Sequence, residues 1–265
     1  MNDDIKTKIK KFFSYVFIDG LTGMAWGLFS TLIIGLIIEQ LGKLIGGNVG
    51  NLIVVIGKIA ASLTGAGIGV GVAVKYKETP FVTISAAIAG LIGAFASKIL
   101  QGSVIVDGTI ILNGPGEPLG AFIASFVGII CGRWIQGKTK LDIILVPIFT
   151  IMIGGAVGLL VGPPISNFML ALGELINWAV TKQPIIMGIL VSVLMGMILT
   201  LPISSAALAI ILNLSGLAGG AATVGCCANM VGFAVASFKE NGISGLISQG
   251  LGTSMLQVPN IMKKP

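Results

Sequence analysis

Residues 183–238 decide the fold class, because the stretch QPIIMGILVSVLMGMILTLPISSAALAIILNLSGLAGGAATVGCCANMVGFAVASF contains no Asp, Glu, Lys or Arg. A single helix of these 56 residues would be about 84 Å long. The hydrocarbon core of a bilayer is only about 30 Å thick. The stretch therefore predicts either two membrane crossings with additional buried backbone, or one crossing with a re-entrant pair.

The whole chain shares this apolar character. It has 265 residues, of which 55% are hydrophobic and 10% are charged, and its mean hydropathy is +1.03. A soluble domain carries about 25% charged residues, so this composition excludes an ordinary soluble protein. It predicts an all-α, polytopic transmembrane helical bundle with re-entrant segments or helices broken by Pro and Gly. Further charge-free runs cover residues 20–38, 59–74, 79–97, 118–132, 143–173 and 241–262.

Charged residues outside these runs predict a topology. Residues 1–17 carry four lysines next to aromatic residues, a pattern typical of an interfacial amphipathic helix, and residues 18–265 form the predicted transmembrane domain. Basic residues occur in 75–78 and 133–142, whereas 101–117 contains no Lys or Arg. Because basic loops remain in the cytoplasm, we expect a cytoplasmic N-terminus. The net charge of +6 then reflects topology and does not indicate a nucleic-acid partner.

Small residues recur at helical spacing. Residues four apart lie on one face of a helix, and small residues there allow two helices to approach closely. The stretch GAGIGVG (65–71) fails the G-x-G-x-x-G spacing of a dinucleotide-binding turn. Close helix packing is therefore predicted for all of these glycines, which are Gly23, Gly27, Gly65, Gly67, Gly69, Gly71, Gly154, Gly158 and Gly162.

Prolines interrupt the late apolar runs. The segments VGPPISNFM (161–169) and TLPISSAAL (200–208) both place Pro-Ile-Ser after an apolar stretch, and a third proline follows in LQVPN (256–260). Proline breaks a helix, and broken backbone at membrane depth survives only beside protein or a water-filled cavity. Paired interruptions indicate a transport site. The alternative is that these prolines mark ordinary interfacial turns.

Uncharged polar residues gather in the last third of the chain. Gln249, Thr253 and Gln257 are spaced i, i+4, i+8, which predicts a polar stripe on one helix. Such groups suit a neutral polar solute, although hydrogen bonds between helices would explain them equally well. Asp19 either caps a helix that begins near Leu21 or faces a polar cavity. The candidate ligand-binding residues are Asp19, Ser204, Ser205, Asn229, Gln249, Thr253, Ser254 and Gln257.

The sequence offers no residue constellation for catalysis. It contains no His, and its three cysteines, Cys131, Cys226 and Cys227, form no C-x-x-C motif. Neither a nucleophile–base pair nor a carboxylate pair is recognisable. We therefore predict no catalytic residues, no metal and no cofactor, and an enzymatic role is not expected of this chain by itself.

Four stretches carry a resemblance to a known family. They are FIDGLTGMAWGLFSTLIIG (17–35), GPPIS (162–166), GGAATVGCCANMVGFAVASFKENG (219–242) and QGLGTSMLQVPNI (249–261). They resemble the EIIC-like family of bacterial phosphotransferase-system membrane proteins, in a stand-alone IIC form without IIA or IIB domains. The resemblance implies a homodimer in the bacterial cytoplasmic membrane that holds a solute between transmembrane and re-entrant elements. Members of this family continue beyond this point, so we expect further C-terminal membrane segments.

The resemblance leaves two functions open. One is a transporter of a sugar or another small polar solute, for which phosphotransfer would need a separate IIB-type phosphodonor protein. Family sugar sites use Glu and His, however, and this chain has no His. The other is a non-transporting membrane receptor or regulator that kept the EIIC fold and binds a small or lipid-like ligand. Membrane lipid is an expected partner in both cases.

Overall fold

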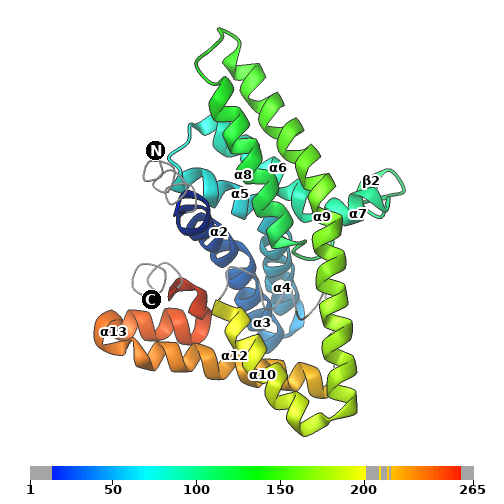
Figure 1. The fold of residues 1–265 in the computed structure, drawn as a ribbon, viewed down its shortest axis with the longest axis vertical. Helices are drawn as coiled ribbons and strands as arrows, with labels where there is room; N and C mark the ends of the chain where they lie inside the picture. Colours follow the sequence, from blue (N-terminus) through cyan, green and yellow to red (C-terminus); the bar gives the residue numbers. More distant parts are fainter. Residues whose placement is uncertain (1–13, 201–208, 210–213, 215, 258–265) are drawn as a thin grey trace, which may run out of the picture. The chain divides into compact units, whose positions relative to one another are not determined.

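The computed structural model describes residues 14–200, 209, 214 and 216–257. It divides into two compact units, Met1–Gly162 with Met262–Pro265, and Pro163–Ile261. In the described part of the chain every element except one short hairpin is helical (Figure 1). The all-α prediction is thereby confirmed. The predicted interfacial helix over 1–17 lies mostly outside the described residues.

Unit 1 begins with one continuous helical run that contains two π-helical segments. This run from Ser14 to Ile45 is long and apolar enough to cross a membrane. A turn at Gly46 and Gly47, whose φ angles are 67° and 62°, reverses the chain, because glycine adopts positive φ without a Cβ clash. The elements of unit 1 are η1 (Ser14–Gly20), α2 (Leu21–Leu28), η2 (Phe29–Ile33), α3 (Ile34–Ile45), α4 (Gly47–Ser62), α5 (Thr64–Lys75), α6 (Pro80–Ala94), α7 (Ala96–Leu100), β1 (Ile105–Val106), β2 (Thr109–Ile110), α8 (Pro118–Ile135) and the first part of α9 (Asp142–Lys182).

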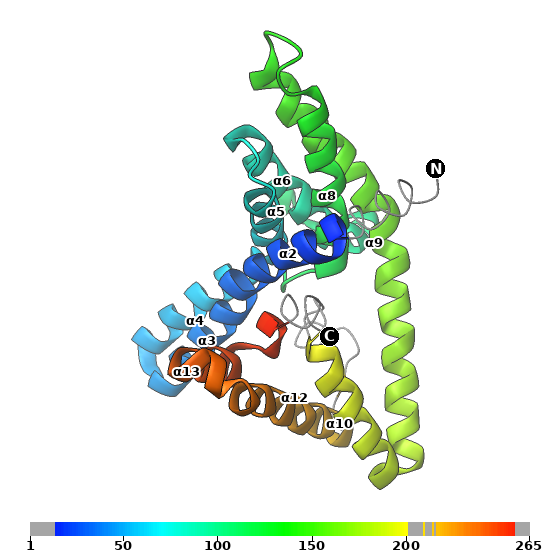
Figure 2. The same ribbon diagram turned by 60° about the vertical axis from the view of Figure 1, so that its left-hand side comes forward.

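The glycines of α5 place this helix against α2 and α6 (Figure 1, Figure 2). A Cβ at Gly65 would lie 2.8 Å from the carbonyl oxygen of Gly90, and one at Gly69 would overlap the backbone of Ala86, so both face α6. A Cβ at Gly67 or Gly71 would instead meet α2. Glycines two residues apart lie about 200° apart around a helix. The alternating GAGIGVG pattern therefore makes two close-packing faces, and the packing prediction is confirmed.

The first part of α9 packs against α6 and α8 by the same principle. A Cβ at Gly154 would lie 2.6 Å from the carbonyl oxygen of Ala124, and one at Gly158 would lie 2.9 Å from the Cα of Gly93. These contacts leave room for nothing larger than hydrogen. The i, i+4 spacing of the α9 glycines thus has the predicted structural role.

The 101–117 segment contains a β-hairpin that the all-helical interpretation missed. Asp107 and Gly108, with φ angles of 49° and 73°, connect β1 to β2, and Val106 pairs with Thr109 in antiparallel register. Positive φ at both central residues is the mark of a type I′ turn, for which Asp-Gly is a favoured sequence.

Two long helices of unit 2 lie among the described residues of the charge-free run 183–238. They are α10 (Pro184–Thr200) and α12 (Gly216–Ala236). They pack closely, because a Cβ at Gly196 would lie 2.8 Å from the carbonyl oxygen of Gly225. The chain then continues through α13 (Phe238–Ile247), η3 (Ser248–Gly252) and η4 (Ser254–Gln257). The Pro-Ile-Ser break predicted at 200–208 lies outside the described residues after Thr200, and the break predicted at 256–260 lies largely outside them.

The prediction of a helix break at VGPPISNFM is wrong. Helix α9 continues from Asp142 to Lys182 through Pro163 and Pro164. A proline inside a helix removes one backbone donor, so the carbonyls of Leu159 and Leu160 lose their usual partners. Membrane helices tolerate such a loss, because neighbouring groups and local adjustments satisfy the freed carbonyls.

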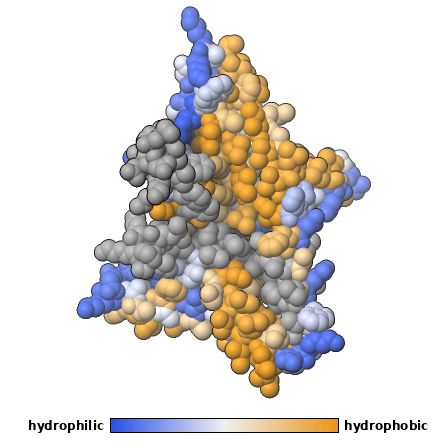
Figure 3. Space-filling model, in the orientation of Figure 1, coloured by the Kyte–Doolittle hydropathy of each residue, from blue (hydrophilic) through white to orange (hydrophobic). Residues whose placement is uncertain are grey.

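Several of the described helices suit a bilayer. Four are long and apolar enough to cross a membrane, and the number becomes five if α4 and α5, bent by 53°, form one broken span. Figure 3 shows hydrophobic residues covering α8 and the early turns of α9, with hydrophilic residues at the loop that joins them. The protein is therefore a polytopic membrane protein, as its composition predicts.

Candidate functional site

A polar cavity lies in unit 2 where α13, η3 and η4 meet. Its volume is about 370 Å³. Gln249 and Gln257 are only 3% and 8% exposed, so their amides reach the cavity from a buried position. The lining residues are Asn241, Ser244, Gly245, Ser248, Gln249, Leu256 and Gln257.

Two glycines of α13 shape this cavity. Gly242 has φ 60° and ψ −157° and interrupts the helical dihedrals of α13, a conformation that side chains disfavour. A Cβ at Gly245 would overlap Asn241. Glycine at these two positions therefore lets the chain bend and lets the Asn241 side chain lie across the helix at the cavity wall.

Gln249 is held by a hydrogen bond to Ser237, the residue between α12 and α13. Its Nε2 donates to the Ser237 hydroxyl at 3.0 Å, and that hydroxyl donates to the carbonyl of Phe233 at 2.7 Å. A serine hydroxyl carries a single hydrogen. Although Gln249 Oε1 lies 3.4 Å from the same hydroxyl, the hydrogen is directed to Phe233. The amide oxygen of Gln249 is thus available as an acceptor.

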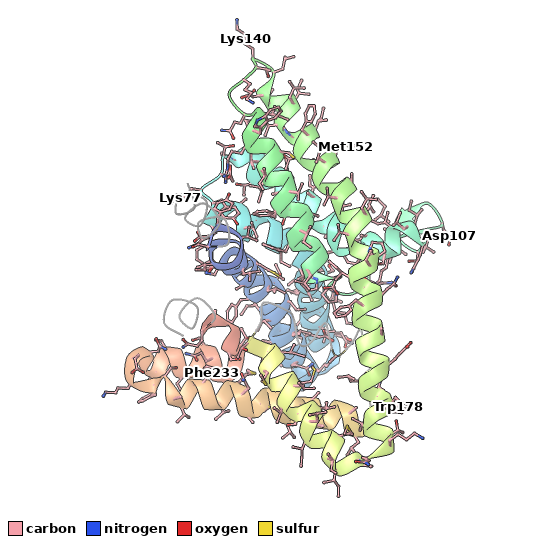
Figure 4. All side chains as sticks on the ribbon, in the orientation of Figure 1. Lys77, Asp107, Lys140, Met152, Trp178 and Phe233 are labelled. Carbon is pink, nitrogen blue, oxygen red and sulfur yellow. The ribbon has the colours of Figure 1, made fainter. Side chains whose placement is uncertain are left out.

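Two buried oxygens of unit 2 lack a hydrogen-bond partner. They are Asn229 Oδ1 and Ser254 Oγ, and Ser254 is 0% exposed. Asn229 lies on α12 beside a second cavity of about 250 Å³, which Gly232, Phe233 and Ala236 also line; Figure 4 labels Phe233 on this helix. A buried polar group without a partner costs about 1–3 kcal/mol. Unit 1 has two oxygens of the same kind, on Tyr15 and Thr150, and of the four residues only Asn229 lines one of the described cavities.

The predicted polar stripe is wrong in its geometry. Thr253 has extended dihedrals, φ −162° and ψ 141°, between η3 and η4, so Gln249 and Gln257 do not share one helix. The chain break nevertheless buries both glutamines, Thr253 and Ser254. Four of the candidate residues are therefore buried in one short segment, although not through the periodicity that suggested them.

The remaining candidates lie elsewhere. Ser204 and Ser205 are outside the described residues. Asp19 lies in unit 1 and does not cap α2, because the N-cap residue is Gly20 and no side chain provides a cap. Its carboxylate lies 3.4 Å from Lys75 Nζ instead. The helical run continues through Asp19 from η1, which leaves no helix start there to cap.

The cavity lining includes three residues that the sequence analysis does not predict, which are Asn241, Ser244 and Ser248. Their spacing of i, i+3, i+7 is that of one helical face, so a polar pattern was present in the sequence. The charges of Lys239 and Glu240 just before this face would also fit a loop. The structure shows instead that α13 begins at Phe238.

The lining residues offer hydrogen bonds but no ionisable group. Neither described cavity of unit 2 is lined by an acidic or basic side chain. In the described part of the chain no three His, Cys, Asp or Glu residues are grouped as metal ligands. Amides and hydroxyls both donate and accept, and Leu256 and Phe233 add apolar surface. This arrangement can bind a neutral polar molecule, and it contains no group for acid–base chemistry.

A second polar cluster, in unit 1, is paired internally. Arg133 Nε donates to Glu78 Oε1 at 2.7 Å, and the Glu78 side chain is 5% exposed. The Tyr76 hydroxyl donates to the carbonyl of Tyr15 at 2.8 Å, and burial raises the pKa of Tyr76. The cluster joins α8 to the segment after α5 and to η1, so its role is structural.

The fold and the polar cavity define a multi-pass membrane protein that can bind a neutral solute. A family model described as "Phosphotransferase system, EIIC" matches residues 18–265. The chain belongs to this EIIC family and is a phosphotransferase-type membrane transporter component. The family implies a sugar-type substrate and a phosphotransferase-system partner. No curated protein and no solved structure matches the chain significantly.

Proposed function

We propose that this protein transports a sugar or another small polar solute, which binds in the unit 2 cavity lined by Gln249 and Gln257. One observation carries the proposal: amides and hydroxyls line this cavity, and two of its amides, those of Gln249 and Gln257, are buried. Elsewhere among the described residues of unit 2, Asn229 and Ser254 each bury an oxygen without a hydrogen-bond partner. Sugar hydroxyls donate and accept hydrogen bonds, so they complement groups of this kind.

Transport follows from the placement of these groups in broken helices. The Gly242 bend and the break at Thr253 set polar side chains at interruptions of the helix, as in discontinuous helices of transporters. Thr253 completes the proposed ligand set together with Ser204 and Ser205, which lie outside the described residues. None of the described lining residues is ionisable, and we expect phosphorylation of the solute to use a separate IIB-type phosphodonor protein.

The proposal includes the setting of the protein. We place it as a homodimer in the bacterial cytoplasmic membrane with a cytoplasmic N-terminus, since the basic segments 75–78 and 133–142 lie at alternate loops. Residues 1–17 then lie at the cytoplasmic interface. Accessibility labelling of single cysteines at Lys138 and Asp107 tests this orientation, because the two loops should be labelled from opposite sides.

Uptake into proteoliposomes tests the transport function. The full chain is reconstituted, and a panel of radiolabelled hexoses, hexitols and disaccharides is supplied with and without its IIB partner. Gln249→Ala and Gln257→Ala, which both truncate side chains that line the cavity, should each lower solute affinity at least tenfold without unfolding the protein. Thr223→Val is the matched control, because Thr223 is exposed on α12 and bonds only its own helix, at Gly219. Unchanged affinity in both alanine variants would rule out this cavity.

A receptor or regulator is the second candidate function. It is favoured by the absence of any ionisable lining residue and of histidine from the whole sequence, because neither feature is needed for binding alone. Tight solute binding by isothermal titration without uptake, even with the IIB partner present, would support the receptor. Measurable uptake would contradict it.

A further inference from the structure

Unit 1 contains a cavity of a different kind, enclosed by α6, α7 and the β-hairpin. Its volume is about 310 Å³, within the lower range of ligand sites. No polar side chain lines it, so a sugar would find no hydrogen-bond partner there. The lining residues are Leu91, Ile92, Phe95, Ile99, Gly102, Val104, Ile105, Ile110 and Leu112.

The cationic side chain of Lys98 lies at the edge of this cavity. Lys98 Nζ lies 5.5 Å from the centroid of the Phe95 ring, and it donates to the carbonyl of Asn113 at 2.6 Å. Phe95 and Leu112, the neighbour of Asn113, both line the cavity. The Lys98 side chain is exposed, and within the described residues it forms no salt bridge. Its charge is thus available to an anionic group at the cavity mouth.

The hairpin places the cavity mouth beside apolar surface that faces outward. Ile105 and Ile110 are 64% and 70% exposed, while the turn at Asp107 is polar (Figure 3, Figure 4). An apolar hairpin with a polar tip is compatible with the boundary between acyl chains and headgroups. Leu100, at the end of α7, is 61% exposed and extends the same apolar surface.

We propose that this cavity binds an anionic phospholipid, with an acyl chain inside and the headgroup phosphate on Lys98. Both parts of the ligand have a counterpart in the protein. The apolar cavity accommodates the acyl chain, and Lys98, which forms no salt bridge within the described residues, attracts the phosphate. A polar solute has no acyl chain to fill the apolar cavity. A zwitterionic lipid has no net negative charge and therefore interacts less favourably with Lys98. The site is separate from the proposed solute cavity, which lies in the other unit.

Photolabelling of the wild-type full chain tests the position of the acyl chain. The protein is reconstituted in vesicles that contain phosphatidylglycerol with a diazirine in one acyl chain, and labelled peptides are mapped by mass spectrometry. We expect labelling concentrated within 91–112 and reduced at least fivefold by excess unlabelled phosphatidylglycerol. Diffuse labelling over all apolar helices, with no competition, would overturn the proposal.

Two sets of variants test the acyl-chain cavity and the Lys98 contact separately. Vesicles of equal phosphatidylglycerol and phosphatidylcholine are extracted, and lipids retained per chain are counted by native mass spectrometry. Leu112→Trp or Ile99→Trp fills the cavity and should remove one retained lipid of either type. Lys98→Gln should keep the lipid and reduce the preference for phosphatidylglycerol at least threefold. The controls Leu52→Trp and Lys58→Gln, both exposed on α4, should match the wild type.

Three results would contradict the lipid proposal or one of its parts. If folded cavity-filling variants retain as many lipids as the wild type, no lipid occupies the cavity. If Lys98→Gln keeps the wild-type preference, the headgroup does not rest on Lys98. If Ile110→Cys forms disulfides between two chains, and phosphatidylglycerol does not prevent them, a second copy covers this surface and the lipid assignment is wrong.

Discussion

Helices α5 and α12 are both rich in glycine, and they use it differently. A Cβ at any glycine of α5 would contact a neighbouring helical segment, mostly its backbone or a methyl group. On α12, Gly225 meets the backbone of Ser192, whereas nothing lies within 4 Å of a Cβ at Gly220 or Gly232. The same residue therefore closes an interface in unit 1 and borders open space in unit 2.

The difference extends to polar groups. Around α5 the buried hydroxyl of Thr64 bonds the carbonyl of Ala61 at 2.6 Å. On α12 the buried Oδ1 of Asn229 has no partner, and Gly232 lies beside it in the same cavity. Small residues lower the cost of close packing in one helix, and in the other they leave room for a ligand. We infer that α5 and its neighbours form a closely packed scaffold in unit 1 and that unit 2 carries the proposed solute site.

The largest effect should come from closing the α5 interface. Gly69→Ala places a methyl group against the backbone of Ala86, and overpacking of this kind costs about 1–3 kcal/mol. Gly232→Ala is the matched control, because its methyl group meets open space and alanine favours a helix by about 1 kcal/mol. Thermal unfolding in detergent should thus show a loss of stability in the first variant and none in the second. Equal effects of the two variants on stability would contradict the proposed difference between α5 and α12.

Removing an unpaired hydroxyl should cost little stability. Ser254→Ala deletes a buried oxygen that has no partner, so the free energy of unfolding should change by less than about 1 kcal/mol or rise slightly. Solute binding should weaken in the same variant. Thr64→Ala offers the contrast, because it breaks a buried hydrogen bond and should lose about 1 kcal/mol. A large loss of stability in Ser254→Ala would show that the oxygen serves the fold.

The sequence predicts the scaffold better than the site. Glycine spacing predicts close contacts at Gly23, Gly27 and the α5 glycines because one geometric rule, residues four apart on one face, suffices. The hairpin was missed, although Asp107-Gly108 between apolar residues is a recognised turn signal. Helix α9 passes Pro163 because tertiary surroundings override a local preference.

The site could be predicted only as a region. Gln249 and Gln257 are buried as proposed, but Thr253 breaks the helix that was expected to align them. Asn241 reaches the cavity wall through the positive φ of Gly242, a conformation that hydrophobic periodicity does not reveal. Residue types thus indicated the chemistry of the site, while its geometry depends on chain breaks.

The buried carboxyl group of Glu117 should make the stability of unit 1 depend on pH. Glu117, 6% exposed, accepts a hydrogen bond from the Leu119 amide at 3.2 Å, yet burial raises its pKa above the ordinary value of 4.5. The folded protein therefore binds this proton more tightly than the unfolded chain. This contribution to stability is present below pH 4.5 and is lost as the pH rises through the folded pKa.

Glu117→Gln should flatten that dependence. Unfolding temperatures measured in detergent between pH 4 and pH 8 should decline less with rising pH in the variant than in the wild type. Glu240→Gln, an exposed control in α13, should leave the wild-type slope unchanged. Parallel curves for Glu117→Gln and the wild type would mean that the buried acid does not couple to folding.

The smallest effect should come from Asp19, which sharpens the boundary between scaffold and site. Its pair with Lys75 joins side chains that are 40% and 29% exposed, and exposed pairs contribute about 0–1 kcal/mol. Asp19→Asn should thus lower stability only slightly, by thermal unfolding. If Asp19 belongs to the scaffold, solute affinity stays within twofold of the wild type. A tenfold loss of affinity in a stable Asp19→Asn variant would instead assign this residue to the ligand site and show that unit 1 contributes to binding.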